Sequence, residues 1–248
     1  MTPLLEFADV YYRYPGQERY ALDGLTVAFP GGENIALIGR NGAGKSTLFL
    51  HCNGLYRPDT GEVRFGGRPL AYDRKSLKVL RQHIGVVFQN ADEQLFSASV
   101  AQDISFGPFN LGLTEQEVRR RVQMAAELCE VVEMLERPTH ALSGGEKARV
   151  ALAGVLAMDP DILISDELMA NLDPWGRRRI FDIFKRLHRR GKTIVLATHD
   201  LNVVRRWATY VVVMAGGRAA FAGSPDDLLA NQAVLDETGL AEVWFDEF

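Results

Sequence analysis

The amino-acid sequence predicts an α/β protein built on a mostly parallel sheet, with an antiparallel β part at the N-terminus and a helical insertion. Residues 4–29 alternate apolar and polar positions, which is typical of antiparallel strands. Between residues 112 and 158 apolar side chains recur every three or four positions, as on one face of a helix. The last part of the chain alternates short β-branched runs with helical stretches, at 161–165, 175–189, 193–197, 201–208 and 211–214. This alternation predicts parallel βαβ units.

Composition places the chain among ordinary globular proteins. It has 248 residues, 47% of them apolar, and a net charge of −4, so no global attraction to nucleic acid or to anionic membranes is expected. Two distant cysteines, Cys52 and Cys129, fit a reducing cytoplasm. We expect no targeting segment and no membrane span. We divide the chain into a domain of residues 1–224, with a helical subdomain at about 90–158, and a C-terminal helical tail at 225–248.

A glycine-rich segment carries the clearest chemical signal. Residues 39–46 read Gly-Arg-Asn-Gly-Ala-Gly-Lys-Ser and match GxxxxGK[ST], between an apolar run at 35–38 and a helical stretch at 45–52. Such a loop turns backbone N–H groups toward an anion, while Lys45 reaches the β- and γ-phosphates and Ser46 offers a hydroxyl to Mg²⁺. A plain strand-to-helix turn is the alternative, but Lys-Ser after the last glycine adds nothing to a turn. We therefore predict a P-loop NTPase core.

Two carboxylates follow an apolar run further along the chain. The run at 162–165 ends in Asp166 and Glu167. We assign Asp166 to a Mg²⁺ ion and Glu167 to the side of the γ-phosphate. Alone, an Asp-Glu pair after a strand more often begins a turn or caps a helix. The interpretation depends on the phosphate loop.

A third motif opens the helical stretch near residue 144. Ser143 and Glu146 have the spacing of a capping box, which explains those two positions structurally. Gly144 and Gly145 do not fit that explanation, because each costs about 1 kcal/mol of helix propensity relative to Ala. Bare backbone is useful there if a phosphate must approach closely.

Taken in order, these motifs resemble those of the ATP-binding cassette ATPases across nearly the whole chain, together with Gln89 after an apolar run, Leu172-Asp173 and Thr198-His199-Asp200. The resemblance implies ATP and Mg²⁺ as cofactors, with Tyr14 stacked on adenine and Asp173 in a loop that spans a dimer. It implies that the γ-phosphate bound by one subunit is contacted by His199 in cis and by residues 143–146 of the opposite subunit. Singly, Tyr14 reads as a turn aromatic and His199 as the neighbour of a helix-capping Asp200.

The residues assigned by this resemblance form three groups. The catalytic group is Glu167, His199 and Gln89, where Gln89 also links the nucleotide site to a transport partner. The Mg²⁺ group is Ser46, Gln89 and Asp166. The ATP-binding group is Tyr14, Gly39, Asn41, Gly42, Ala43, Gly44, Lys45, Ser46, Thr47, Ser143, Gly144, Gly145 and Glu146.

Segments 12–15, 88–96 and 100–108 resemble the ATPase subunits of energy-coupling factor importers, closest to the cobalt/nickel or CbiO-type subgroup. The chain departs from the usual pattern at Leu168-Met169, where Pro-Thr is common, and at Ala91, where Pro is common. The resemblance implies an ATPase at the cytoplasmic face of the membrane that imports cobalt, with nickel or a vitamin as alternatives. Its implied partners are a transmembrane coupling protein, a substrate-binding component, and a second copy or a paralogue; nucleic acid is not among them.

Two other functions remain open at this point. A non-transport cassette ATPase of DNA maintenance or translation is disfavoured by the single cassette, by the lack of a coiled-coil insertion between residues 96 and 142, and by the net charge. A P-loop kinase acting on a small metabolite conflicts with the motif at 142–146. For docking of a membrane partner, the importer resemblance favours an acidic-edged apolar groove formed by Asp92, Glu93, Gln94, Leu95, Phe96 and Val100. A solvated turn leading into the helical insertion is the alternative for this segment.

Overall fold

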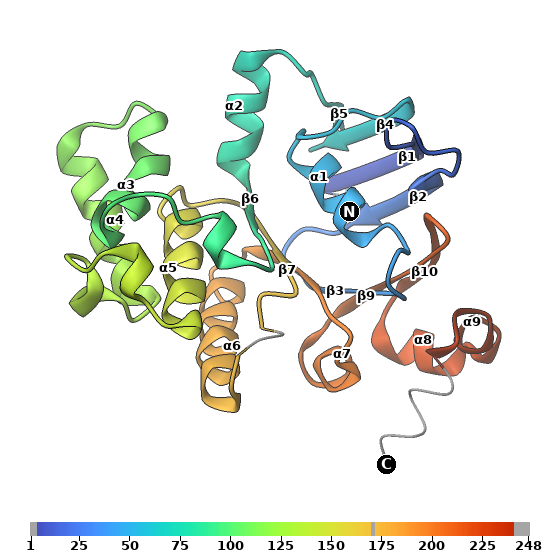
Figure 1. Ribbon diagram of the computed structural model, residues 1–248. Coiled ribbons are helices and arrows are strands. Elements are labelled where there is room, and N and C mark those ends of the chain that lie inside the picture. Colours follow the sequence, from blue (N-terminus) through green and yellow to red (C-terminus); the bar gives the residue numbers. More distant parts are fainter. Residues whose placement is uncertain (1–3, 170–171, 241–248) are drawn as a thin grey trace. The chain divides into compact units, whose positions relative to one another are not determined.

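The computed structural model describes residues 4–169 and 172–240, which divide into two compact units (Figure 1). The first unit contains the described residues up to 77 and from 193 onward, and the second contains residues 78–192. The C-terminal helices belong to the first unit.

An antiparallel sheet forms the N-terminal part of the first unit. Its strands are β1 (Leu5–Tyr12), β2 (Leu22–Phe29), β4 (Thr60–Phe65) and β5 (Arg68–Pro69), in the order β2-β1-β4-β5. Phe7 of β1 lies opposite Val27 of β2 and Val63 of β4, and all three side chains are buried. The alternation over residues 4–29 thus marks two strands correctly, while β4 and β5 were not predicted.

A parallel set of strands forms the rest of the first unit. β3 (Asn34–Ile38) lies between β8 (Thr193–Ala197) and β9 (Tyr210–Ala215), with β10 (Arg218–Gly223) antiparallel to β9 at the edge. All five residues of β3 are buried. The helices of this part are α1 (Lys45–Cys52) after β3 and α7 (Leu201–Trp207) between β8 and β9. The carboxyl end of β3 therefore leads directly into the glycine-rich loop.

Two short helices follow the last strand, α8 (Pro225–Ala230) and α9 (Gln232–Thr238), drawn in red in Figure 1. Ser224 and Asn231 cap their N-termini with side-chain oxygens. Leu228 and Leu235 are buried in a cluster with Ile38 and Val213 of the parallel strands. Both helices lie within the predicted C-terminal segment 225–248, of which residues 241–248 lie outside the described part of the chain.

The second unit combines two parallel strands with a set of helices. β6 (Ile84–Val87) pairs with β7 (Ile162–Asp166), and α2 (Arg74–His83) crosses the boundary at residue 77. The helices are α3 (Val100–Asn110), α4 (Glu115–Leu128), α5 (Gly144–Leu156) and α6 (Pro174–His188), with 3₁₀ turns at Ala91–Glu93, Val132–Met134 and Thr139–Ala141. Helices α3, α4 and α5 pack side by side (Figure 1), which places the predicted helical subdomain within this unit. Among the described residues no helix is both long and apolar enough to cross a bilayer.

Candidate functional site

The glycine-rich loop between β3 and α1 has the geometry of an anion-binding nest. Gly39 and Gly44 have φ of +152° and +103°, backbone angles that residues with a side chain rarely adopt. A Cβ at Gly39 would lie 2.3 Å from the carbonyl oxygen of Met214, and one at Gly44 would lie 2.6 Å from that of Ala21. Both glycines are thus required by the chain's own backbone path, and that path keeps the loop tight against β9 and β2.

Lys45 is held beneath this loop. Its side chain is buried, and its Nζ donates hydrogen bonds to the carbonyl oxygens of Gly39 (2.7 Å) and Arg40 (3.3 Å). Gly44 is the N-cap of α1 and brings no side-chain acceptor to the first turn of the helix. A buried ammonium group, a helix N-terminus and glycine N–H groups therefore gather where a phosphate would bind.

Tyr14 lies near the first turns of α1. Its hydroxyl and that of Thr47 form a hydrogen bond of 3.0 Å, and its ring is half-buried. The ring packs edge-on against Tyr12 and Tyr56, with centroid distances of 5.3 and 5.8 Å. Tyr14 and Thr47, both assigned to ATP from the sequence, are thus joined directly, and stacking of Tyr14 on adenine stays a prediction.

The carboxylate pair lies in the second unit at the end of β7. Asp166 is the last residue of the strand, and Glu167 follows with a φ of +46°, a left-handed conformation that is uncommon for a residue with a side chain. Gln89 follows β6, the strand paired with β7, and its Nε2 donates to Glu167 Oε2 at 3.2 Å. Strained backbone of this kind costs about 1–3 kcal/mol and is concentrated at functional sites. Two of the three predicted catalytic residues are thus in contact.

Ser143 and Glu146 form the predicted capping box at the start of α5. The Ser143 N–H donates to Glu146 Oε2 at 2.7 Å, and the Glu146 N–H donates to Ser143 Oγ at 3.4 Å. The hydrogen bonds from Ser143, with a further one from Arg137 at 2.8 Å, lower the pKa of Glu146 to about 2. Arg137 was missed in the sequence because nothing in its loop marks it as a partner of α5.

The two glycines after Ser143 have a different environment. A Cβ at Gly144 would meet nothing within 4 Å, and one at Gly145 would approach only Leu172, at 3.8 Å. Packing against the residues that the structure describes therefore does not explain why both positions are glycine. The observation supports the interpretation that something outside the chain approaches the first turn of α5.

His199 and Asp173 occupy the starts of two other helices. Asp200 caps α7 by accepting from the Asn202 N–H at 2.9 Å, and its own N–H donates to Thr198 Oγ1 at 3.0 Å. His199 lies exposed between them in the first unit. Asp173 caps α6 in the second unit by accepting from the Gly176 N–H at 2.6 Å. Both residues lie on turns fixed by neighbouring hydrogen bonds.

The predicted site residues thus form two sets. The first unit carries Tyr14, residues 39–47 and His199, and the second carries Gln89, residues 143–146, Asp166 and Glu167. Within the part of the chain that the structure describes, no group of three or more His, Cys, Asp or Glu side chains is arranged to hold a metal ion.

The predicted docking groove is wrong in part. Val100 is completely buried in α3 and cannot line a surface, and Asp92 forms an ion pair with Lys147 of α5. The exposed apolar side chains here are Phe96, Phe106 and Phe109, which are 65%, 50% and 72% exposed. Phe96 and Phe106 pack edge-on at 4.7 Å. We call these three residues the aromatic patch.

The loop that carries Phe96 is held against α3 by a buried carboxylate. Asp103 accepts hydrogen bonds from the N–H groups of Phe96 (3.0 Å) and Ser97 (2.8 Å). Sequence reasoning missed Asp103, as well as Phe106 and Phe109, because the helical spacing of α3 is interrupted by Gly107 and Pro108.

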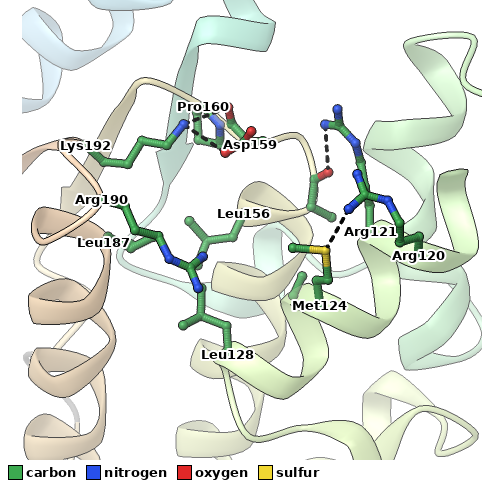
Figure 2. A pocket seen from close by; sticks show the side chains of 12 residues that line it. Arg120, Arg121, Met124, Leu128, Leu156, Asp159, Pro160, Leu187, Arg190 and Lys192 are labelled. Carbon is green, nitrogen blue, oxygen red and sulfur yellow. Dashed lines mark hydrogen bonds and ion pairs between the residues drawn. The ribbon is translucent and has the colours of Figure 1, made fainter.

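A separate pocket of about 290 Å³ lies in the second unit between α4, the end of α5 and the end of α6 (Figure 2). Four cationic side chains line it above an apolar floor. Arg120 pairs with Glu117, Arg121 donates to the carbonyl oxygens of residues 157 and 158, and Lys192 pairs with Asp159. Most of this positive charge therefore neutralises acids and helix C-termini of the same unit, and the pocket contains none of the predicted nucleotide-binding residues.

Comparison with known proteins places these motifs in a family. Residues 22–170 match the model of the ABC transporter family. The chain is 44% identical over 240 residues to the cobalt import ATP-binding protein CbiO of Rhodobacter capsulatus, covering 97% of this chain and 85% of that protein. It is 42% identical over 245 residues to the energy-coupling factor transporter ATP-binding protein EcfA of Methanosphaera stadtmanae, covering 98% and 87%.

A solved structure agrees with these relatives. CbiO1 from Clostridium perfringens, part of the ABC transporter complex CbiONQ, superimposes with a TM-score of 0.83 at 41% identity, covering 97% of this chain and 96% of that one. The family match, the two relatives and this structure agree with the order of motifs along the chain. The protein therefore belongs to the ABC transporter family, whose ATP-binding subunits are ATPases that power transport.

Proposed function

We propose that this protein is the ATP-hydrolysing subunit of an energy-coupling factor importer, located peripherally at the cytoplasmic face of the membrane. The relatives named EcfA and CbiO support this assignment, and CbiO favours cobalt as the cargo over nickel or a vitamin. Its partners are a membrane-embedded coupling protein, a substrate-binding component, and a second copy of the chain or a paralogue.

Nucleotide binding is assigned to the loop at residues 39–47. Its turned glycines and the buried Lys45 receive the β- and γ-phosphates, and Tyr14 supplies an aromatic face for the base. The Ser46 hydroxyl is exposed at the start of α1, and the half-buried Asp166 carboxylate ends β7. These are hard oxygen donors that fit Mg²⁺, which neutralises phosphate charge when bound.

Hydrolysis is assigned to Glu167 and Gln89. The carboxylate of Glu167 accepts a proton from, or orients, the attacking water, and Gln89 keeps that carboxylate in place through its 3.2 Å hydrogen bond. His199 contacts the γ-phosphate from the same chain. The left-handed backbone at Glu167 is the single observation that carries this assignment, because neither helix nor strand formation requires it.

We further propose that each site is completed by the first turn of α5 from a second chain. The absence of close neighbours among the described residues around a Cβ at Gly144 or Gly145 supports this, since bare backbone at the start of a helix suits the approach of a phosphate held by another chain. Glu146 does not bind phosphate directly in this arrangement. Its ionised carboxylate is engaged by Ser143 and Arg137 and instead fixes the turn.

A surface near Asp173 supports the same arrangement. Trp175, in the first turn of α6, is 74% exposed, and exposed tryptophans are enriched among residues that dominate binding energy at protein interfaces. We assign Trp175 to the contact between two chains.

The aromatic patch supports docking to a membrane partner. Three phenylalanine rings at least 50% exposed lie on α3 and on the loop before it, the loop that continues from Gln89. A short apolar helix of a coupling protein would bury these rings. Because Gln89 donates a hydrogen bond to Glu167, docking of a partner helix on this patch could change the position of the catalytic carboxylate.

The function is tested in two steps with the full chain. Purified protein should hydrolyse Mg-ATP, and Glu167→Gln should retain ATP affinity while losing most turnover. Cells that express the chain with a coupling protein and a substrate-binding component should then accumulate radiolabelled cobalt, and the same variant should not. Hydrolysis at the normal rate by Glu167→Gln would refute the catalytic assignment. Hydrolysis without uptake of cobalt, nickel or a vitamin would favour a non-transport ATPase.

A further inference from the structure

The end of α9 lies against the phosphate loop. Gly239 terminates the helix in a left-handed conformation, with a φ of +69°. Arg40, the second residue of the loop, covers this glycine: a Cβ at position 239 would lie 2.0 Å from its Nη2 and 3.0 Å from its Cζ. The guanidinium group therefore occupies the space that any side chain at position 239 would need.

Both sides of this contact are anchored. Leu235 of α9 is only 1% exposed and belongs to the core cluster, and Thr238 Oγ1 donates to the carbonyl oxygen of Val234 at 2.6 Å within the last turn of the helix. On the other side, the Arg40 carbonyl accepts from the Ala43 N–H at 3.1 Å and from Lys45 Nζ at 3.3 Å. The residue whose side chain rests on α9 is thus one of the two residues whose carbonyl oxygens accept from Lys45 Nζ.

Electrostatics favours this position of the Arg40 side chain. A pocket of about 190 Å³ separates loop residues 40–43 from Glu237 and Thr238, with residues 214–216 as a third wall. The C-terminal end of a helix carries partial negative charge, and Glu237 adds a carboxylate to the same pocket. Negative charge therefore lies on the α9 side of the pocket that Arg40 also lines.

A helix-ending glycine has an ordinary explanation, since many helices end on a glycine with positive φ. That explanation accounts for the φ of Gly239 but not for the side chain lying on it. Gly112 provides the comparison: it follows the C-cap of α3 with a φ of +83°, and a Cβ there would meet nothing within 4 Å.

We propose that α9 positions the phosphate loop through the contact between Gly239 and Arg40, which makes Arg40 a positioning residue for nucleotide binding. This inference rests on the proposed binding of ATP at the loop. Arg40 is exposed, and the contact with Gly239 restricts the positions that its long side chain can take, which lowers the ordering cost of nucleotide binding. The contact also provides a route by which a change at the C-terminal end of the chain reaches the nucleotide site.

The test is a double-mutant cycle on the full chain, with ATP affinity measured by calorimetry in the absence of Mg²⁺. Gly239→Ala displaces the guanidinium group, so the dissociation constant for ATP should rise roughly three- to tenfold, the cost of immobilising one long side chain. Arg40→Ala should raise it by a similar factor. Adding Gly239→Ala to Arg40→Ala should change nothing further, because the group that it displaces is already gone.

Gly112→Ala is the matched control, because it imposes the same backbone strain in open space and should leave ATP affinity unchanged. With Mg-ATP, Gly239→Ala should raise KM while kcat stays within about twofold, a split that general destabilisation of the fold would not produce. An equal effect of Gly239→Ala with and without Arg40, or no effect on affinity, would overturn the proposal. If the unchanged chain failed to bind ATP, the proposed function itself would be refuted.

Discussion

Tyr14 offers the nucleotide site two groups, an aromatic ring and a hydroxyl, and substitutions can test them separately. Its ring supplies an aromatic face near α1, and its hydroxyl is bound to Thr47 at 3.0 Å. Removing the ring removes both, whereas removing only the hydroxyl leaves the face. The nucleotide site as proposed depends on the face.

Tyr14→Ala should therefore weaken ATP binding by about 1–3 kcal/mol, the range measured for aromatic stacking on bases. Tyr14→Phe is the matched control and should bind ATP nearly as well as the unchanged protein. GTP should substitute tolerably for ATP, since stacking reads no base-specific edge. Equal weakening by both variants in a calorimetric titration would assign the role to the hydroxyl instead.

Glu146 makes a prediction about acid stability. Its folded pKa of about 2 lies below the ordinary value of 4.5, so the ionised carboxylate stabilises the folded chain above pH 4.5 and this contribution is lost as the pH falls toward 2. Between pH 5.5 and 3.5 the unchanged protein should lose about 1 kcal/mol more unfolding free energy than Glu146→Gln. Urea titrations at the two pH values measure this difference, and equal losses would contradict the capping role of the carboxylate.

At the scale of elements, the aromatic patch carries the prediction about docking. Reversing the charges of Asp92 and Glu93 would be a poor test, because Asp92 already pairs with Lys147 and a lysine at position 92 would repel it. Replacing Phe96 and Phe109 with Ser removes the two most exposed rings of the aromatic patch and leaves the ion pair between Asp92 and Lys147 intact.

The double variant Phe96→Ser/Phe109→Ser should keep the ATPase activity of the isolated protein and lose copurification with the membrane components. Met124→Ser is the control, since Met124 is 48% exposed on α4 outside the patch. Retained assembly and uptake in the double variant would place the docking surface elsewhere.

The elements that the sequence predicts are those marked by residues within or next to them. The limits of α1 agree with the predicted 45–52 because a glycine loop precedes it, and the strands β3, β7 and β8 read as short apolar runs. The sequence did not predict β4, because three of its six residues are exposed and its apolar residues do not alternate regularly with polar ones. Helix α3 contains Gly107 and Pro108, residues that are typical of loops, so the sequence did not predict a helix there. A Cβ at Gly107 would lie 2.9 Å from Met158 Sδ, so close packing requires that glycine.

For the candidate site, too, the sequence predicts single motifs but not the contacts between them. Single motifs predicted the phosphate loop, the carboxylate pair and the capping box. The contacts between motifs were not visible: Gln89 and Glu167 are separated by 78 positions, and the left-handed φ of Glu167 leaves no trace in its residue type. Arg40 was passed over because the motif places no constraint on its position.

For the whole molecule, the proposed shared sites require two chains for each pair of nucleotides. Trp175 should contribute to that association because it is large, exposed and adjacent to Asp173. Trp175→Ala should weaken the ATP-dependent dimer by at least about 1 kcal/mol, the cost that separates the few dominant residues of an interface from the rest. Val79→Ala is the control, because it removes a 51% exposed side chain elsewhere and should leave association unchanged. Phe181→Ala, on the same helix as Trp175, is not a suitable control because Phe181 is half-buried. An unaltered dimer constant for Trp175→Ala would move the interface away from the start of α6.

The shared nucleotide site is the central claim, and sedimentation velocity of Glu167→Gln tests it most directly. This variant should bind Mg-ATP without hydrolysing it, so the closed pair of chains should accumulate. We expect monomers without nucleotide and dimers at saturating Mg-ATP, and Gly144→Gln in the same background should prevent the dimer by blocking the first turn of α5. A sample of Glu167→Gln that binds ATP and stays monomeric at saturation would contradict the claim.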